Sequence, residues 1–289
     1  MSQPAASSVR VYLLQDDYAR KRGFLGQHGF AALVEAEGPG GTSRVLVDTG
    51  QEASTVLANA ERLGVDLGRV DAILITHGHY DHNGGLLGIL DQVGAEGKLV
   101  LMHPDALKPK FAIKPRFRFV GTPGLTAGAL EGRGAVLLLS REPVELAPFL
   151  RTTGEVPRQT PFEHVEGFLT LGPDGVGLVE DKLLDDQALV VRHRDGLVVI
   201  TGCAHSGVVN TLLHARELLG EERILAVLGG FHLEGASDER LRATVRELQR
   251  LEPERVYACH CTGLKAFCQL MAAFGPRFRR LGSGDVVEL

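Results

Sequence analysis

The chain has 289 residues, of which 44% are hydrophobic and 23% charged, an ordinary balance for a globular protein with a full core. Its net charge of −5 argues against a nucleic-acid partner, because binding to phosphate backbones needs a basic surface. No apolar run approaches a membrane span and residues 1–8 lack the features of a signal peptide, so we expect a cytoplasmic protein with no membrane partner.

Strands and helices alternate along the first part of the chain. Strands are expected where Val and Leu gather, and helices where apolar residues recur every three or four positions. The predicted elements up to residue 102 are strands at 9–14, 31–36, 44–47, 70–75 and 98–102, and helices at 52–63 and 86–93. Residues 103–133 are rich in Pro, Gly and basic side chains, which predicts a long loop or a small excursion there.

The same alternation returns in the second half. Strands at 188–193 and 197–201 flank a hairpin turn at Asp195-Gly196, and Ser206 is expected to cap a helix that runs to Leu219. The remaining predicted elements are strands at 223–228 and 255–258, and helices at 238–251 and 262–274. The simplest architecture is a single α/β domain over residues 1–289, with two sheets packed face to face and helices outside.

Four side chains that can bind metal fall within six residues, directly after the predicted strand at 70–75. They are His77, His79, Asp81 and His82. Imidazole nitrogen suits zinc, iron, manganese or nickel, and a carboxylate balances their charge. The spacing places His77 beside His79, while Asp81 and His82 can turn toward a second position about 3.5–4 Å away, the usual distance between paired metals. Surface histidines in a polar turn are the alternative interpretation.

Four ligands do not complete two metal positions, so distant residues must contribute. His205 and His260 each stand where a predicted strand gives way to a helix. Because the carboxyl ends of strands collect at one edge of an α/β sheet, we predict both as ligands. His232 lies at a third such junction, and we expect it to contact substrate or support a ligand, with a purely structural role as the alternative.

The segment His-x-His-x-Asp-His followed by Gly84-Gly85 resembles the signature of the metallo-β-lactamase superfamily. The turn Asp48-Thr49-Gly50 is similar to an early turn of that family, in which the aspartate supports the metal loop. The resemblance implies a four-layer αββα sandwich (the metallo-β-lactamase fold) and one or two divalent transition metals. Zinc is the first choice, with iron or manganese as alternatives. It also implies an enzyme with hydrolytic chemistry, and we hypothesise that Asp81 is both a ligand and a proton acceptor.

Later motifs resemble one branch of this superfamily, which contains an archaeal dihydropterin-6-yl-methyl-(ribofuranosyl)aminobenzene 5′-phosphate synthase and bacterial relatives. The motifs lie at 154–158, 185–189, 201–210, 228–233 and 259–263. The chain lacks the superfamily's His-Thr-Pro-Gly-His segment, so we assign the third ligand of the first metal to His205.

Cys203 stands where the superfamily often has a bridging aspartate. We hypothesise that its thiolate replaces that carboxylate, and the alternative is a small buried apolar side chain. The four cysteines give no disulfide framework, which fits the reducing cytoplasm.

A basic run at residues 108–118 suggests the substrate. Lys110, Lys114 and Arg116 lie among aromatic residues, a mixture that can bind phosphate and stack on a flat ring, although a solvated loop explains it equally well. We therefore expect a metal-dependent hydrolase or transferase acting on a small anionic substrate, phosphorylated and pterin-like by family analogy. The alternatives are a metal-dependent nuclease or phosphodiesterase and a non-catalytic metal-dependent sensor. A homo-oligomer is compatible with the sequence.

Overall fold

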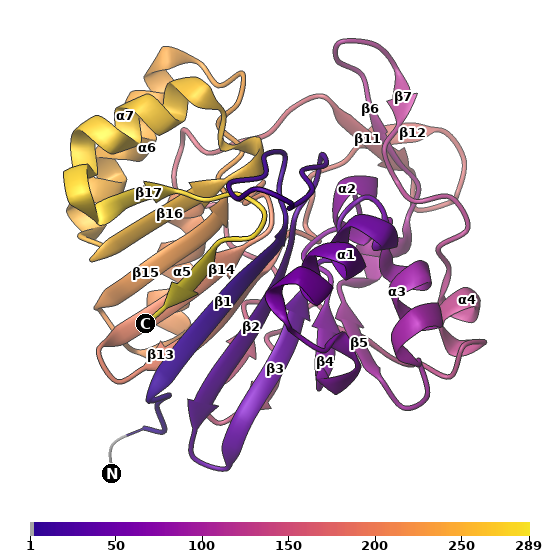
Figure 1. The fold of residues 1–289 in the computed structure, drawn as a ribbon. Helices are drawn as coiled ribbons and strands as arrows, with labels where there is room; N and C mark the ends of the chain where they lie inside the picture. The colour runs from indigo at the N-terminus through magenta and orange to yellow at the C-terminus, as the bar shows by residue number, and fades with distance from the viewer. Residues whose placement is uncertain (1–2) are drawn as a thin grey trace.

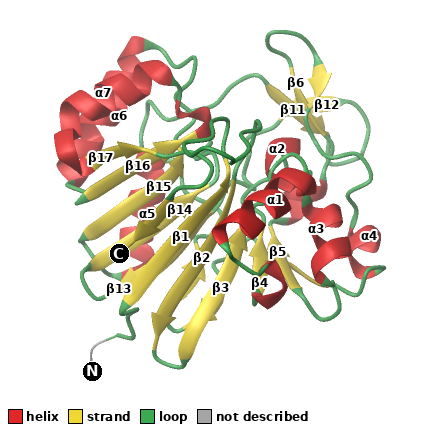
Figure 2. Ribbon diagram, viewed as in Figure 1, coloured by secondary structure: helices red, strands yellow, loops and turns green. Residues whose placement is uncertain are grey.

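The computed structural model of the chain describes residues 3–289. Two seven-stranded sheets pack face to face, and helices cover their outer faces (Figures 1 and 2). Alternate side chains of both sheets meet between them in one core, which includes Val11, Val34, Leu189 and Val198. Separate apolar clusters join each sheet to its helices. The four-layer αββα sandwich predicted from the sequence is therefore confirmed.

The first sheet combines an antiparallel half with a parallel half. In spatial order its strands are β18 (Val286–Glu288), β1 (Ser8–Gln15), β2 (Ala31–Gly38), β3 (Gly41–Val47), β4 (Ala72–Leu74), β5 (Leu99–Met102) and β8 (Val136–Leu139). Strands β3, β4, β5 and β8 run parallel, so their carboxyl ends share one edge. Helices α1 (Ala53–Leu63) and α3 (Leu86–Val93) pack on the outer face through residues such as Val56 and Leu90.

The second sheet is arranged in a similar way. In spatial order its strands are β17 (Phe278–Arg280), β16 (Arg255–Cys259), β15 (Ile224–Gly230), β14 (Gly196–Thr201), β13 (Ala188–His193), β10 (Leu150–Thr152) and β9 (Glu145–Ala147). Strands β14 to β17 run parallel, and the predicted hairpin joins β13 to β14. Three helices cover the outer face: α5 (Val208–Leu219), α6 (Asp238–Leu251) and α7 (Leu264–Phe274).

The helices predicted at 86–93 and 238–251 have those bounds in the structure, but the predicted cap of α5 is wrong. Gly207, not Ser206, precedes the helix. The backbone N–H of Ser206 donates to Asp186 at 2.8 Å. The carboxylate of Glu163 instead accepts the N–H groups of Val209 and Asn210 at 3.0 and 2.8 Å, so a distant loop caps this helix.

Residues 103–133 are an excursion with structure of their own. They contain β6 (Lys110–Ala112), β7 (Arg118–Phe119) and α4 (Ala127–Glu131). With β11 (Phe168–Leu171) and β12 (Leu178–Glu180), the two strands form a four-stranded sheet that stands apart from the sandwich, at the upper right of Figure 1. Within residues 3–289, no helix combines the length and apolarity that crossing a bilayer requires.

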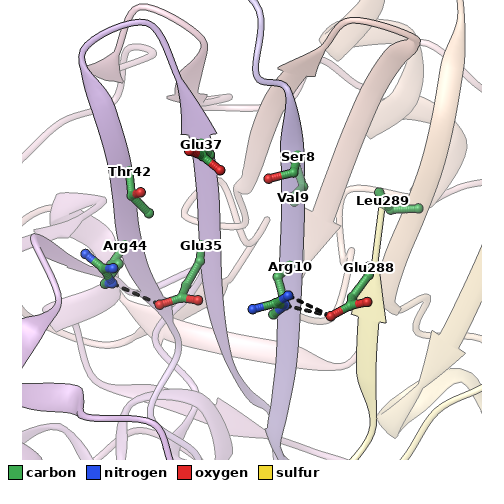
Figure 3. A pocket seen from close by; sticks show the side chains of 9 residues that line it. All are labelled: Ser8, Val9, Arg10, Glu35, Glu37, Thr42, Arg44, Glu288 and Leu289. Atoms are coloured by element: carbon green, nitrogen blue, oxygen red, sulfur yellow. Dashed lines mark hydrogen bonds and ion pairs between the residues drawn. The ribbon is translucent and has the colours of Figure 1, made fainter.

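A hollow of about 350 Å³ lies on the outer face of β1, β2, β3 and β18 (Figure 3). Its walls carry two ion pairs, Arg10 with Glu288 at 2.8 Å and Arg44 with Glu35 at 2.9 Å. No histidine or cysteine lines it. The paired charges make this a solvated sheet face rather than a site for chemistry.

Candidate metal centre

The predicted metal-binding loop follows β4, at the carboxyl edge of the first sheet. His77 and His79 lie on the loop, and Asp81 and His82 lie on the four-residue helix α2 (Tyr80–Asn83) that ends it. All four residues are buried. Gly78 makes the tight loop feasible, because a Cβ there would stand 2.5 Å from the carbonyl oxygen of Ala106.

Three histidines form the first group of converging nitrogens. The Nε2 atom of His77 lies 3.1 Å from Nδ1 of His79 and 3.2 Å from Nε2 of His205. His205 comes from the junction between β14 and α5, so this group joins the two sheets. The structure thus brings together the three residues that the sequence assigned to one metal.

Asp81, His82 and His260 form the second group. The Nε2 atom of His260 lies 3.3 Å from Nε2 of His82 and 3.3 Å from Oδ2 of Asp81. His260 begins the short turn after β16 and has a φ of 47°, a left-handed conformation that a non-glycine residue adopts only under constraint. This group also unites loops from both sheets.

Cys203 lies between the two groups. Its Sγ atom is 3.1 Å from Nε2 of His82. It shares one cluster with His77 and His205 and another with His82 and His260, and in each cluster the ligand atoms lie within 4.8 Å of one another. Burial raises the pKa of this thiol, so without a metal ion the sulfur is protonated. A thiolate at this place therefore depends on a nearby cation.

Carboxylates fix the orientation of His82 and His260 by contacting the Nδ1 atom of each ring. Asp48 Oδ2 lies 2.6 Å from Nδ1 of His82, and Asp48 also accepts the backbone N–H and the hydroxyl of Thr76, both at 2.7 Å. Asp17 Oδ1 lies 2.9 Å from Nδ1 of His260. These contacts leave the Nε2 atoms of His82 and His260 directed at the centre, as metal-binding histidines require.

The ionisation of the cluster suits metal ligands. Burial lowers the pKa of His79 to about 3, and it lowers the pKa values of His77 and His205 well below their ordinary range. Burial alone would raise the pKa of Asp81, but the charges of His82 and His260 outweigh it and hold that pKa well below the usual value. Burial opposes a charge on His260, but Cys261 and the carboxylates of Asp17 and Asp81 outweigh it and raise that pKa well above the ordinary value. The first group thus presents neutral imidazoles, whereas a metal ion in the second group would meet an ionised Asp81 and displace the proton of His260.

The spacing of the donors also fits a transition metal. Two nitrogens bound at about 2.05 Å to one tetrahedral ion lie about 3.3 Å apart. The facing nitrogens in both groups are separated by 3.1–3.3 Å. Nitrogens that converge at this spacing are what one tetrahedral metal ion would bind.

A cavity of about 200 Å³ opens onto this cluster. Its lining includes donors from both groups and side chains from the four-stranded sheet: His28, His79, Tyr80, Asp81, Arg118, Val120, Phe168, Cys203, His205, His232, Glu234, His260 and Cys261. His232 lines the wall, and its ring lies 4.1 Å from that of His205, centroid to centroid. The cavity is where a substrate would meet the metal centre.

The basic run is arranged differently from the prediction. Lys110 does not line the cavity; it is buried and pairs with Asp181 at 2.7 Å and Asp185 at 2.9 Å. Asp185 in turn accepts the backbone N–H of Gly78, so Lys110 supports the metal loop. Lys114 and Arg116 are exposed and lie outside the cavity lining. Arg118 is the cation of this run that reaches the cavity.

Sequence reasoning missed Asp16, Asp17 and His28. The side chain of His28 bridges two acids, with Nδ1 3.3 Å from Asp17 and Nε2 3.3 Å from Asp81. Asp16 accepts the backbone N–H of His260 at 2.6 Å. Their position in the sequence could have indicated two of them. Asp16 and Asp17 directly follow β1, and the other site residues also lie just after the carboxyl end of a strand.

Comparisons with known proteins identify the family of this chain. A sequence profile described as the metallo-beta-lactamase superfamily matches residues 26–260. The chain is 33% identical over 286 residues to a 7,8-dihydropterin-6-methyl-4-(beta-D-ribofuranosyl)-aminobenzene-5′-phosphate synthase of Methanocaldococcus jannaschii, covering 97% of each chain.

Solved structures share the fold. Tm1679, a metal-dependent hydrolase of the beta-lactamase superfamily, superposes with a TM-score of 0.81 at 33% identity, covering 97% of this chain and 99% of the other. Zn²⁺-bound PqqB from Methylobacterium extorquens superposes with a TM-score of 0.56 at 13% identity, covering 97% and 100%. The second likeness concerns the fold alone.

Proposed function

The chain belongs to the metallo-beta-lactamase superfamily and is an enzyme of that superfamily, and from this premise we propose its ligands and its substrate class. His77, His79 and His205 would hold one divalent transition metal, and Asp81, His82 and His260 a second. Zinc is our first choice, because imidazole nitrogens with one carboxylate and one sulfur suit it, with iron or manganese as alternatives. The convergence of these donors on one cavity is the observation that carries the proposal.

Bound there, a divalent ion supplies Lewis-acid chemistry near neutral pH. The protein's own residues supply proton handling. Asp81 lines the cavity, and its Oδ2 atom lies 3.3 Å from Nε2 of His28, whose ring is half exposed. We assign Asp81 as the proton acceptor and His28 as the group that passes the proton to solvent. The Asp17 carboxylate behind His28 keeps that ring oriented.

We propose a small anionic substrate that contains a phosphate and a pterin-like ring. The archaeal relative is named for a compound that combines a dihydropterin, an aminobenzene and a ribose phosphate, and the match to it covers 97% of each chain. Arg118 can pair with a phosphate, and Phe168 and Tyr80 offer flat faces in the same cavity. The cavity of about 200 Å³ lies below the roughly 300–1,000 Å³ of pockets that enclose a whole ligand, so it would hold only part of the substrate.

A nuclease or phosphodiesterase acting on nucleic acid is the weaker alternative. The net charge is −5, and the buried Lys110 of the basic run is neutralised by Asp181 and Asp185. Phosphate-backbone binding needs several free cations along one groove. We therefore favour a small substrate.

We also propose a cytoplasmic location. The four cysteines are free thiols, which fits a reducing compartment.

One experiment tests the proposal and separates hydrolase from transferase. Protein loaded with zinc, manganese or iron is incubated with an aminobenzene riboside phosphate and a reduced pterin whose methyl group carries a diphosphate leaving group, and separately with generic phosphoesters, in ¹⁸O-labelled water. Hydrolysis puts the label into a product, whereas group transfer joins the pterin methyl carbon to the aminobenzene compound and releases unlabelled diphosphate. We expect turnover that EDTA abolishes and added metal restores. If neither reaction occurs and neither compound binds to any metal-loaded form, the proposed substrate class is wrong.

A further inference from the structure

Three side chains beside the two histidine groups converge on one another. They are Cys203, His232 and Cys261, and they come from the junctions that follow β14, β15 and β16. Their ligand atoms all lie within 4.8 Å of one another, and all three line the cavity. His232 and Cys261 belong to neither of the two metal positions described above.

The separation of the two sulfurs lies between that of a disulfide and that of two ligands of a single ion, and nearer to the second. The Sγ atoms of Cys203 and Cys261 are 3.3 Å apart. Two sulfurs bound at about 2.3 Å to one tetrahedral ion lie about 3.8 Å apart, whereas a disulfide joins sulfurs at about 2.05 Å. The third donor is available too, since Nδ1 of His232 is buried and has no hydrogen-bond partner within residues 3–289.

Backbone contacts hold the three loops in this arrangement. The N–H of Gly230 donates to the carbonyl of Gly202 at 3.0 Å, and the N–H of Leu233 donates to the carbonyl of Cys261 at 3.1 Å. A Cβ at Gly230 would lie 2.7 Å from Sγ of Cys261, so glycine permits the close approach. His232 is held with a φ of 43°. The donors are therefore positioned by the fold before any ion binds.

We propose that Cys203, His232 and Cys261 form a third, sulfur-rich metal position that shares the Cys203 sulfur with the two histidine groups. Two sulfurs and one imidazole select soft or borderline ions such as Zn²⁺, Cd²⁺ or Cu⁺ over Mg²⁺ or Ca²⁺. The position opens onto the cavity, which leaves room for a fourth ligand from solvent or substrate. The proposal concerns metal alone and goes beyond the proposed reaction, so a failure to find turnover does not bear on it.

Titration of the reduced, metal-free protein with Co²⁺ and with Cd²⁺ tests the proposal. Thiolate-to-cobalt charge transfer reports the sulfur ligands, and Cd²⁺ binding gives the stoichiometry. We expect Cys261→Ser and His232→Ala each to bind one equivalent of Cd²⁺ fewer than the wild type. Cys261→Ser should also lose part of the charge-transfer absorption. Cys268→Ser is the matched control, because Cys268 is an exposed residue of α7, and it should bind like the wild type.

Two outcomes would overturn the proposal. One is equal stoichiometry and an unchanged cobalt spectrum in Cys261→Ser. The other is a count of two free thiols rather than four in the metal-free protein kept under mild reductant, since that would mean a bond between Cys203 and Cys261. Circular dichroism checks that each variant is folded. If Cys261→Ser does not fold, His232→Ala decides the question alone, because its side chain is only half-buried and its truncation leaves both sulfurs in place.

Discussion

Oδ2 of Asp48 lies 2.6 Å from Nδ1 of His82, and both side chains are fully buried. We expect Asp48→Asn to weaken metal binding at the position of His82 about 10–100-fold, the usual effect of losing a carboxylate behind a histidine ligand. Competition with a chromophoric chelator measures the affinity. Asp66→Asn, which changes an aspartate in an exposed turn, should leave the affinity unchanged. Equal affinities in the two variants would mean that Asp48 does not support the ligand.

His79→Ala and His260→Ala should each lower the metal content and abolish turnover while the protein stays folded. Both histidines lie on loops at the strand ends, so their truncation opens space toward the cavity rather than within the sheet-to-sheet core. Elemental analysis and circular dichroism measure the two effects. His164→Ala is the control, because His164 is exposed and lies outside the cavity lining. Full metal content in either variant would remove that residue from the ligand set.

Cys203→Ser and Cys203→Asp distinguish a metal-binding sulfur from a packed one. If the sulfur binds metal, the Cys203→Ser variant should have a lower affinity for the second metal. The Cys203→Asp variant should recover part of that affinity, because its carboxylate supplies the negative charge of the lost thiolate. If the side chain only packs, Ser should bind metal normally and Asp should destabilise the fold, because it buries an unpaired charge. Calorimetric metal titration of both variants gives the answer.

Lys110→Met should destabilise the fold by about 3–5 kcal/mol, because it leaves two buried carboxylates without their cation. Urea unfolding at pH 7 measures the free energy. Lys114→Met changes an exposed lysine in the same excursion and should stay within about 0.5 kcal/mol of the wild type. A small effect of Lys110→Met would show that the two aspartates find other partners.

The same pair predicts a pH dependence. Burial alone would raise the pKa of Asp185, but the Lys110 ammonium outweighs it and holds that pKa below the usual value. Burial also opposes the charge on Lys110, yet Asp185 and Asp181 raise its pKa above the usual value. Without the ammonium, burial acts alone and raises the pKa of Asp185, so the stability difference between wild type and Lys110→Met should be largest at mildly alkaline pH, below about pH 9. It should shrink as acid protonates the aspartates, and shrink as alkali deprotonates the lysine.

Arg118→Gln should weaken the binding of phosphate-containing ligands about 10–100-fold, the range expected for one charged hydrogen bond of about 1.5–3 kcal/mol. Inhibition of turnover by inorganic phosphate measures the affinity. Arg116→Gln is the matched control, since Arg116 is an exposed neighbour outside the cavity lining, and it should leave the inhibition constant unchanged. Similar constants for both variants would place the anion site elsewhere.

Local patterns in the sequence were enough to predict the αββα sandwich and the position of the loop that carries His77 to His82. The helices at 86–93 and 238–251 have strong periodicity, and His77 to His82 lie together in the chain. The short strands β17 and β18 were not predicted, because three residues carry no readable period and pairing with a neighbouring strand decides their conformation.

Residues whose role depends on contacts between distant segments could not be placed from the sequence. Lys110 resembled a surface cation because its neighbours in the chain are basic, but its partners Asp181 and Asp185 lie about seventy residues away. Asp17 reaches His260 only because the end of β1 lies against the end of β16 from the other sheet. No spacing along the chain encodes these contacts. The four-stranded sheet, in which β11 pairs with both β6 and β12, brings Lys110 close to Asp181, and the stacking of the two seven-stranded sheets brings Asp17 to His260.

The first sheet has the last strand of the chain beside its first strand, with Val11 of β1 paired to Val287 of β18. During synthesis, the edge of β1 that faces β18 stays unpaired until residues 286–288 have been made. The candidate metal centre faces a similar delay, because His260 follows His82 by 178 residues. A chain that stalls before residue 260 can form the loop from His77 to His82 but cannot complete the proposed second metal position.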